Sequence, residues 1–231
     1  MKKIIVGLGI VSFALWMWNT SIFAGQKDSN TTKFVAHRGV HQTFNIELVG
    51  RDDCTASLID KPSHAYLENT IPSIKAAFNA GADVVEIDIQ PTNDGQFIVF
   101  HDWTLDCRTN ATGKTREKSL KELQSLDIGY GYTYDAGKTY PFRGKGIGKM
   151  PSLAQVLTAF PDGEFLINFK GNRSAEGQQL VAFLSANPQW MPAIWGGYGG
   201  ARPTNIATSA LGVKGYSRQS TKACLKNYAL K

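Results

Sequence analysis

The stretch Ala80-Gly81-Ala82-Asp83-Val84-Val85-Glu86-Ile87-Asp88 decides the fold, because it contains the strongest strand signal in the chain. Successive side chains of a strand point to opposite faces, so Glu86 and Asp88 share one face and Val85 and Ile87 the other. Two carboxylates on a buried face need a cation or hydrogen bonds in place of water. Oxygen ligands of this kind suit Ca²⁺ or Mg²⁺. The alternative is an edge strand whose polar face meets water, and the apolar flank Val84-Val85 argues against it.

Strand-like and helix-like segments alternate along the chain, which is the pattern of an α/β protein. Strands are expected near residues 34–37, 82–90, 96–100, 165–170, 193–196 and 210–214. Helices are expected around Ile74 and over residues 120–126, 153–160, 180–184 and about 221–230. Residues 129–150 are expected to form one long loop, and loops of that length are usually functional or mobile.

The connection Pro91–Gly95 is too short for a parallel crossover, which needs a dozen or more residues. Asn93-Asp94-Gly95 is typical turn sequence for a hairpin. The strand that leads to His101 is therefore expected to run antiparallel to the strand before it.

Two titratable pairs follow predicted strands directly, His37-Arg38 and His101-Asp102. A histidine can exchange a proton near neutral pH, and the arginine fork suits phosphate oxygens. Asp102 either orients the ring of His101 or caps the turn. Each pair taken alone is more typical of a surface turn. Together with the carboxylate pair they supply a proton acceptor, a proton donor and charge neutralisation, which phosphodiester cleavage needs.

The order of these motifs resembles the glycerophosphodiester phosphodiesterase family. The matching segments are H-R-G (37–39), E-N-T (68–70), A-G-A-D-V-V-E-I-D (80–88), D-G-Q-F-I-V-F-H-D (94–102) and T-L (104–105). The resemblance covers most of residues 34–170. It implies a TIM-type (β/α)₈ barrel of the phospholipase C-like phosphodiesterase kind.

The resemblance also implies roles for the motif residues. It makes His37 and His101 the catalytic acid/base pair, Arg38 a phosphate ligand, and Glu86 and Asp88 ligands of a divalent metal, Ca²⁺ or Mg²⁺. Glu68 is expected at the rim of the site as a metal or substrate contact, in a segment that also caps the following helix.

The sequence departs from the family pattern at a later strand, where the family has I-E-I-K and this chain has Ile167-Asn168-Phe169-Lys170. Lys170 is still expected to contact phosphate. Asn168 is expected to ligate the metal through a neutral oxygen, which holds a cation more loosely than a carboxylate does.

The predicted strands are fewer than a closed barrel needs. Such a barrel takes about 250 residues, whereas only five of its eight strands are predicted here. The chain is therefore expected to be a partial barrel, truncated at its C-terminal end relative to the family.

The N-terminal segment is expected to be a signal peptide over residues 1–24, followed by the phosphodiesterase domain over residues 25–231. Lys2 and Lys3 precede an apolar run from Ile4 to Trp18, and Ala24 offers a small residue for cleavage. The run is shorter than the ~20 residues of a membrane-spanning helix. A secreted or periplasmic protein is expected, and an uncleaved membrane anchor is the alternative.

The chain contains three cysteines, and an exported protein meets oxidising conditions that permit a disulfide. Cys54 and Cys107 each fall in a loop near a candidate active-site segment, so their pairing is preferred over the two pairings with Cys224. Metal binding by cysteine is not expected, because no C-x-x-C spacing occurs. The net charge of +6 includes no run of like charge, so nucleic acid is not an expected partner.

These observations predict metal-dependent hydrolysis of a small-molecule glycerophosphodiester to glycerol 3-phosphate and an alcohol. Two alternatives remain within the same barrel, a phospholipase D-like enzyme and a phosphoinositide-cleaving phospholipase C. A third alternative is a non-catalytic remnant, favoured by Asn168 and the partial barrel. The alcohol and the oligomeric state are not determined by the sequence.

Overall fold

The computed structural model describes residues 2–19, 32–50, 53–216 and 221–222. The chain forms two units, Met1–Lys33 and Phe34–Lys231, each defined by contacts among its own residues. The first unit contains the helix α1 (Lys2–Asn19). Among the described residues, no helix combines the length and the apolar character that a membrane crossing requires.

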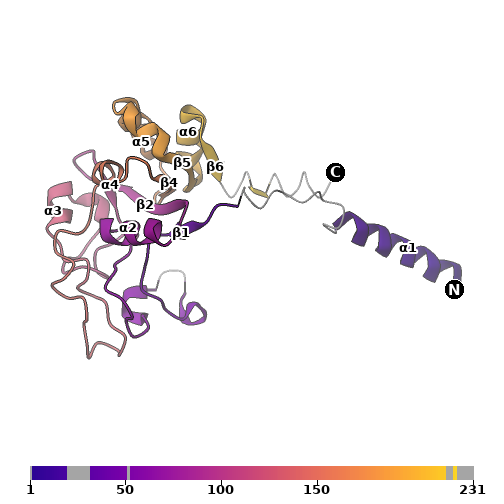
Figure 1. Cartoon of the computed structure of the whole chain (residues 1–231), viewed down its shortest axis with the longest axis horizontal. Coiled ribbons are helices and arrows are strands. Elements are labelled where there is room, and N and C mark those ends of the chain that lie inside the picture. The colour runs from indigo at the N-terminus through magenta and orange to yellow at the C-terminus, as the bar shows by residue number, and fades with distance from the viewer. Residues whose placement is uncertain (1, 20–31, 51–52, 217–220, 223–231) are drawn as a thin grey trace. The chain divides into compact units, whose positions relative to one another are not determined.

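The second unit is built on one sheet with five parallel strands in the order β1-β2-β4-β5-β6 (Figure 1). The bounds are β1 (Val35–His37), β2 (Val84–Pro91), β4 (Glu164–Phe169), β5 (Ile194–Gly199) and β6 (Lys214–Tyr216). The predicted number of parallel strands is confirmed. The sheet is an open arc in the described residues, since β1 and β6 each pair with one neighbour only.

The predicted hairpin is also confirmed. β3 (Phe97–Val99) pairs with the end of β2 in antiparallel orientation, with Ile89 opposite Val99. β3 runs back along β2, with the N–H of Phe100 donating to Asp88 O at 3.0 Å, so His101 leaves the hairpin beside Asp88.

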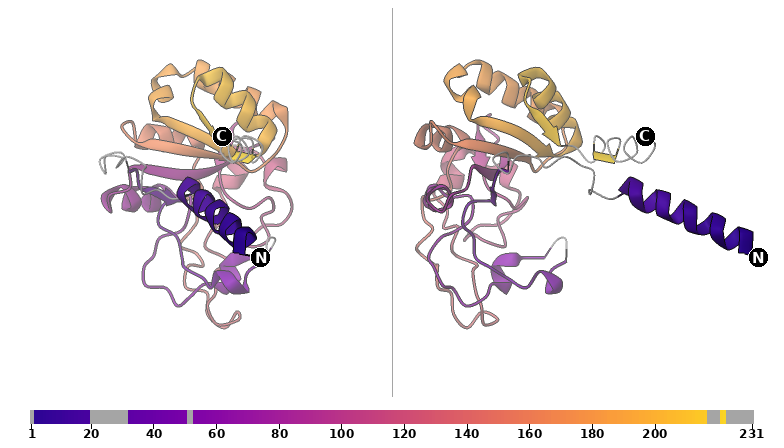
Figure 2. Two further views of the ribbon diagram at one scale, coloured as in Figure 1. Left: turned by 90° about the vertical axis from the view of Figure 1, so that its right-hand side faces the viewer. Right: turned by 45° about the vertical axis from the view of Figure 1, so that its right-hand side comes forward.

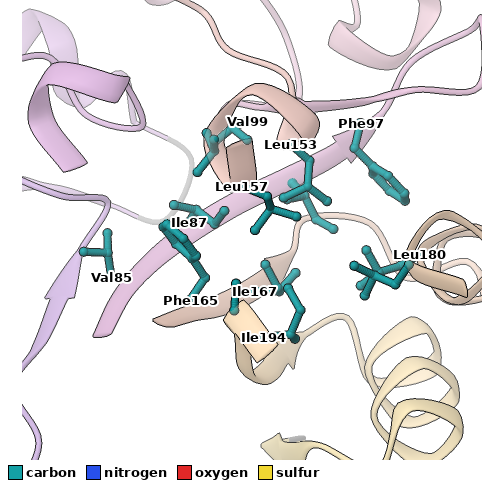
Figure 3. Close-up of a cluster of buried hydrophobic side chains, with 14 of the residues drawn as sticks. Val85, Ile87, Phe97, Val99, Leu153, Leu157, Phe165, Ile167, Leu180 and Ile194 are labelled. Atoms are coloured by element: carbon teal, nitrogen blue, oxygen red, sulfur yellow. The ribbon is translucent and has the colours of Figure 1, made fainter. Parts of the chain in front are cut away.

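Helices cover the apolar face of the sheet. They are α2 (Ile71–Asn79), α4 (Leu153–Ala159), α5 (Ser174–Ser185) and α6 (Ala201–Leu211), with the short α3 (Leu120–Gln124) packed near β3. The short 3₁₀ turns are Ile46–Leu48, Thr55–Leu58, Thr115–Glu117 and Pro188–Ala193. Figure 3 shows Val85 and Ile87 of β2 packed among side chains of β4, β5, α4 and α5. We call this the sheet cluster.

A second hydrophobic cluster lies among the loops. Its buried members are Ala56, Ile59, Leu67, Ile98, Phe100, Leu105, Leu123, Ile128, Tyr132, Phe142 and Met150. Figure 2 shows α5 and α6 on one side of the sheet and the loops that contribute most of these residues on the other. We call this the loop cluster, and the predicted loop 129–150 contributes three of its buried members.

Capping explains where several helices begin. The hydroxyl of Thr70 accepts a hydrogen bond from the backbone N–H of Ser73, and Pro72 stands in the first turn of α2, as the sequence predicts. Ser152 and Gln155 form a capping box at the start of α4.

The position predicted for the last strand is wrong. Residues up to Leu211 complete α6, a helix that the sequence did not indicate, and the strand begins at Lys214. Gly212 ends the helix with a φ of 67° and donates its N–H to Thr208 O, a left-handed cap that glycine adopts readily. The predicted helix at 221–230 lies outside the described residues, apart from 221–222.

Candidate active site

Six of the eight predicted site residues lie on β1, β2 and β4 or directly after β1 and β4, and Glu68 and His101 lie in adjoining loops. These strands are parallel, with His37 of β1 opposite Glu86 of β2 and Asp88 of β2 opposite Asn168 of β4. Lys170 directly follows β4. In barrels of this kind, the carboxyl ends of the strands carry the active site.

Glu86 and Asp88 are almost completely buried, with 2% and 0% of their surface exposed. They share the face of β2 opposite Val85 and Ile87, so the predicted alternation is confirmed. Burial and the neighbouring charge of Asp88 raise the pKa of Glu86 to about 7. Tyr198 of β5 donates a hydrogen bond of 2.8 Å from its hydroxyl to Glu86 Oε1.

Asp88 receives hydrogen bonds from two amides, Asn69 Nδ2 at 2.9 Å and Asn168 Nδ2 at 2.8 Å. Two cations lie beside it, with Arg38 Nε 3.1 Å from Oδ2 and Lys170 Nζ 3.8 Å from Oδ1. Asn168 thus turns its amide nitrogen, rather than its oxygen, toward the carboxylates. Ligation of a metal by Asn168 Oδ1 stays a prediction and requires rotation of this amide.

The H-R-G motif forms a sharp turn out of β1. Arg38 and Gly39 both have left-handed φ angles, 57° and 73°. A side chain on Gly39 would meet the backbone of Ser73 and Ile74 at 2.8–2.9 Å, so glycine fits here because helix α2 approaches closely. The backbone N–H of Arg38 donates to Glu86 Oε2 at 3.0 Å, which holds the turn against the carboxylate pair.

The guanidinium of Arg38 faces both Glu68 and Asp88. Its Nη1 donates to Glu68 Oε1 at 3.0 Å. Its Nε–H does not point at Asp88 despite their short separation, and it has no hydrogen-bond acceptor among the described residues. The protein therefore leaves part of this cation's hydrogen-bonding capacity unused.

The two histidines have different surroundings. His37 Nε2 lies 3.9 Å from Glu86 Oε2. Partial burial and the adjacent charge of Arg38 lower the pKa of His37 to about 4, so the neutral ring is favoured near pH 7. His101 Nδ1 lies 2.6 Å from Asp102 Oδ1, which decides between the two roles considered for Asp102: it orients the imidazole.

Arg108 connects Asp102 to the rest of the site. Its Nε donates to Asp102 Oδ2 at 2.9 Å, and its Nη1 lies 3.3 Å from Glu68 Oε2. Burial would raise the pKa of Asp102, but the charge of Arg108 and the bond to His101 outweigh burial and lower the pKa to about 2. Burial likewise opposes ionisation of Glu68, and the charges of Arg108 and Arg38 still lower the pKa of its carboxyl.

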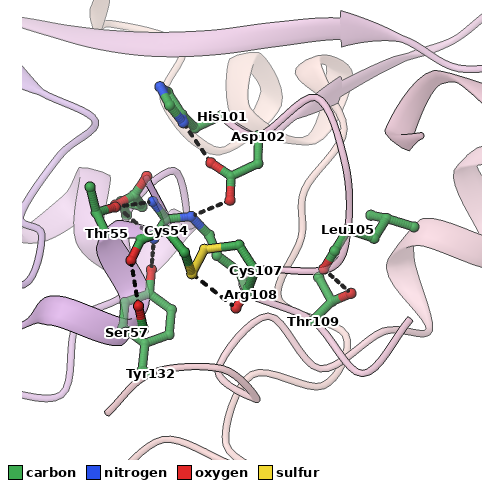
Figure 4. The surroundings of a disulfide bond; sticks show 11 residues. Cys54, Thr55, Ser57, His101, Asp102, Leu105, Cys107, Arg108, Thr109 and Tyr132 are labelled. Carbon is green, nitrogen blue, oxygen red and sulfur yellow. Dashed lines mark hydrogen bonds and ion pairs between the residues drawn. A yellow bond between two sulfur atoms is a disulfide. The ribbon is translucent and has the colours of Figure 1, made fainter. Parts of the chain in front are cut away.

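The predicted disulfide is confirmed, and it lies next to this arginine (Figure 4). Cys54 and Cys107 join the loop that follows β1 to the loop that follows β3. A cleft of about 260 Å³ opens beside them. Its lining consists of Asp53, Cys54, His101, Asp102, Trp103, Thr104 and Cys107.

The carboxylate pair fits a divalent cation. No three acidic, histidine or cysteine side chains in the described part of the chain lie close enough to hold a metal by themselves. Mg²⁺, however, is commonly bound by one or two carboxylates, with water and substrate phosphate oxygens completing its shell. Burial and the adjacent charge of Asp88 raise the pKa of Glu86, and a bound cation would offset both effects.

The structure thus brings all eight predicted site residues to one edge of the sheet or its adjoining loops. Sequence reasoning missed Arg108 and Tyr198 and assigned Asn69 only to helix capping. Tyr198 pairs with Asn168 in register near the end of a predicted strand, which could have indicated it. Arg108 stands in a loop with no periodicity, so no local signal indicated it.

Polar residues at the carboxyl ends of parallel strands define a site of the TIM-barrel type. The model of the glycerophosphoryl diester phosphodiesterase family matches residues 37–182. The chain therefore belongs to this family.

Relatives that are named as glycerophosphodiester phosphodiesterases are similar to this chain. The glycerophosphodiester phosphodiesterase of Caldanaerobacter subterraneus subsp. tengcongensis is 37% identical over 103 residues, covering 45% of this chain and 39% of the relative. A glycerophosphodiester phosphodiesterase of Bacillus subtilis is 38% identical over 124 residues, covering 51% and 41%. The chain thus matches about two fifths of the length of these relatives.

Solved structures show the same fold. The glycerophosphoryl diester phosphodiesterase domain of the Mycobacterium tuberculosis protein Rv2277c superposes with a TM-score of 0.63 at 23% identity, covering 86% of this chain and 65% of that one. An Oleispira antarctica phosphodiesterase, solved in complex with the product sn-glycerol-3-phosphate, has a TM-score of 0.54 at 21% identity, covering 79% and 63%. The fold is therefore of the TIM-barrel type, and the barrel is not closed within the described residues, as the sequence predicts.

Proposed function

We propose that this protein hydrolyses glycerophosphodiesters to glycerol 3-phosphate and an alcohol. The observation that carries the proposal is the convergence of two histidines, two cations and a buried carboxylate pair at one edge of a parallel sheet. Membership of the family and the product named for the Oleispira structure support the same substrate class.

In this proposal the phosphate lies between the cations and the carboxylates. Arg38, which keeps an unused N–H, and Lys170 neutralise its non-bridging oxygens. A divalent cation, Ca²⁺ or Mg²⁺, held by Glu86 and Asp88 would polarise the phosphoryl group and stabilise its developing charge. Membership of a family that generally depends on a divalent metal supports this assignment.

The histidines then divide the proton transfers. His37, whose ring is neutral near pH 7, accepts a proton from the attacking water as the water oxygen bonds to phosphorus. His101 donates a proton to the oxygen of the departing alcohol as its bond to phosphorus breaks. Asp102 suits His101 to this role, since a carboxylate at 2.6 Å from Nδ1 fixes the orientation of the ring.

The test is release of glycerol 3-phosphate from glycerophosphocholine, measured with and without a chelator. Release that stops with the chelator and returns with Mg²⁺ or Ca²⁺ is expected. Release that survives stringent chelation would contradict the metal role. Calorimetric binding of the substrate without turnover would instead favour the non-catalytic remnant.

We also propose that residues 1–24 direct export and are removed. The basic start and the apolar run from Ile4 to Trp18 support this proposal. N-terminal sequencing of the natural protein should begin at Gly25. Recovery of the intact N-terminus in the membrane fraction would favour the uncleaved anchor.

A further inference from the structure

Arg108 is a buried cation that lies one contact away from two groups of the proposed mechanism. Its side chain is only 3% exposed. It contacts neither a histidine nor the Glu86–Asp88 pair. Instead, its guanidinium binds the carboxylates of Asp102 and Glu68. Asp102 in turn binds His101, and Glu68 binds Arg38.

The first connection runs to the proposed proton donor. Arg108 Nε donates to one oxygen of Asp102 at 2.9 Å, and the other oxygen lies 2.6 Å from His101 Nδ1. Both oxygens of Asp102 are therefore bound, which fixes the orientation of the carboxylate.

The second connection runs to the proposed phosphate ligand. Arg108 Nη1 lies 3.3 Å from one oxygen of Glu68, and the other oxygen accepts from Arg38 Nη1 at 3.0 Å. One guanidinium thus binds the carboxylate partners of both His101 and Arg38. A planar fork with five N–H donors can do this, whereas the single ammonium of lysine cannot direct its bonds in this way.

The guanidinium is itself held by two hydroxyl groups of the loops. Nη1 donates to the hydroxyl of Tyr132 and Nη2 to the hydroxyl of Thr55, both at 2.6 Å. Figure 4 shows these partners around the Cys54–Cys107 disulfide. Thr55 follows Cys54 in the chain and Arg108 follows Cys107, so the disulfide ties the acceptor to its donor.

We propose that Arg108 is a positioning residue for His101 and Arg38, and that the Cys54–Cys107 disulfide holds it in place, so that turnover depends on the oxidised protein. The inference rests on the proposed function, because it assigns Arg108 to the same site. It predicts that thiol reductants lower turnover, and that they do so by displacing the side chain of Arg108.

The first test replaces the arginine by Arg108→Gln and Arg108→Lys. Misplacement of reacting groups by an ångström costs about 100-fold in rate, so kcat of Arg108→Gln should fall by that order. The loss should appear in kcat, through misplacement of His101, and in KM, through misplacement of the phosphate ligand Arg38, and Arg108→Lys should recover part of it. A kcat equal to that of the unmodified protein in both variants would overturn the proposal.

Arg143→Gln is the matched control. Arg143 also lies among the loops, stacked 4.0 Å from the ring centroid of Tyr130 and 3.6 Å from that of Tyr140. It contacts none of the site residues named above. If Arg143→Gln lowers kcat as much as Arg108→Gln does, the effect reflects general loosening of the loops and the proposal fails.

The second test addresses the disulfide in a Cys224→Ser background, in which reductant can act only on Cys54 and Cys107. Reduction by dithiothreitol should lower kcat. In a protein that also carries Arg108→Gln, reduction should cause no additional loss of kcat, since the two changes act through the same group. Fully additive losses would show that the disulfide acts independently of Arg108.

A spectroscopic measurement keeps the inference testable without turnover. The short His101–Asp102 hydrogen bond should give a low-field imidazole proton resonance, which Arg108→Gln should shift or abolish and Arg143→Gln should leave unchanged. Absence of glycerol 3-phosphate release by the oxidised Cys224→Ser protein would count against the proposed function. An unchanged resonance in Arg108→Gln would count against this inference alone.

Discussion

The sheet cluster and the loop cluster are both well buried, yet they are stabilised in different ways. The sheet cluster joins strands and helices whose side chains alternate with the period of their own elements, as Val85, Ile87 and Ile89 do on β2. The loop cluster joins segments with little regular structure. It depends on a disulfide and on side-chain contacts to the backbone, such as Asp127, which accepts hydrogen bonds from the N–H groups of Gly129, Gly144 and Gly146.

The sheet and the loops therefore carry different parts of the site. The sheet supplies a rigid edge from which Glu86, Asp88 and Asn168 project. The loops supply His101, Asp102 and Arg108, which orient one another. Damage to the sheet cluster should therefore reduce stability first, and damage to the groups that the loops carry should reduce turnover first.

The largest expected effect is on the rate. His37→Ala and His101→Ala should each lower kcat by about 10²–10⁴-fold, the usual contribution of a general acid or base. Their thermal unfolding should change little, because neither ring belongs to a hydrophobic cluster. A near-normal rate for either variant in the glycerol 3-phosphate assay would remove that histidine from the mechanism.

The next effect is on the sheet cluster. Ile87→Ala should lower the free energy of unfolding by about 2–5 kcal/mol, because Ile87 is fully buried and the substitution leaves a cavity. Val35→Ala on β1, where the side chain is 46% exposed, is the control and should cost much less. Urea unfolding measures both, and equal losses would show that the sheet does not concentrate stability at β2.

Loss of the disulfide should lower the free energy of unfolding by no more than the core cavity does. Replacing Cys54 and Cys107 by serine should lower the free energy of unfolding by about 2–4 kcal/mol, since the bond closes a long loop of the unfolded chain. Cys224→Ser serves as the control. Unchanged denaturant unfolding of the double variant would mean that the loop cluster is stable without its covalent link.

The smallest effect concerns pH. The pKa of Glu86 is raised from 4.5 to about 7, so the folded state holds its proton more tightly than the unfolded state does. Its contribution to stability is fully present below about pH 4.5 and is lost as pH rises through about 7. In the presence of a chelator, the protein should therefore lose stability over this window, and Glu86→Gln should reduce the loss. Identical pH profiles of the two proteins in urea unfolding would contradict the raised pKa.

The sequence predicted the sheet well because its signals are local. The alternation along β2, the short link before β3 and the cap at Thr70 each depend on a few adjacent residues. The same locality misled the prediction near Leu211, where an apolar run that looks like a strand completes α6 before Gly212.

The sequence predicted only those site residues that belong to recognisable motifs. His37 and His101 lie at or just after the ends of strands, and Glu86 lies within the strongest predicted strand, so all three could be predicted from the sequence. Arg108 could not, because its partners Thr55, Glu68 and Tyr132 lie far from it in sequence and meet only through the folded loops. The orientation of the Asn168 amide likewise depends on Asp88 and Tyr198, which a single segment does not contain.

The central claim is that the buried carboxylates and the two histidines form a phosphodiesterase site that releases glycerol 3-phosphate. Phosphorus NMR of glycerophosphocholine tests it most directly, because the diester and each phosphomonoester give separate signals. With Mg²⁺ or Ca²⁺ present, we predict loss of the diester signal and growth of the glycerol 3-phosphate signal, and neither change with Asp88→Asn or a chelator. Appearance of phosphocholine instead, or an equal rate with Asp88→Asn, would contradict the account.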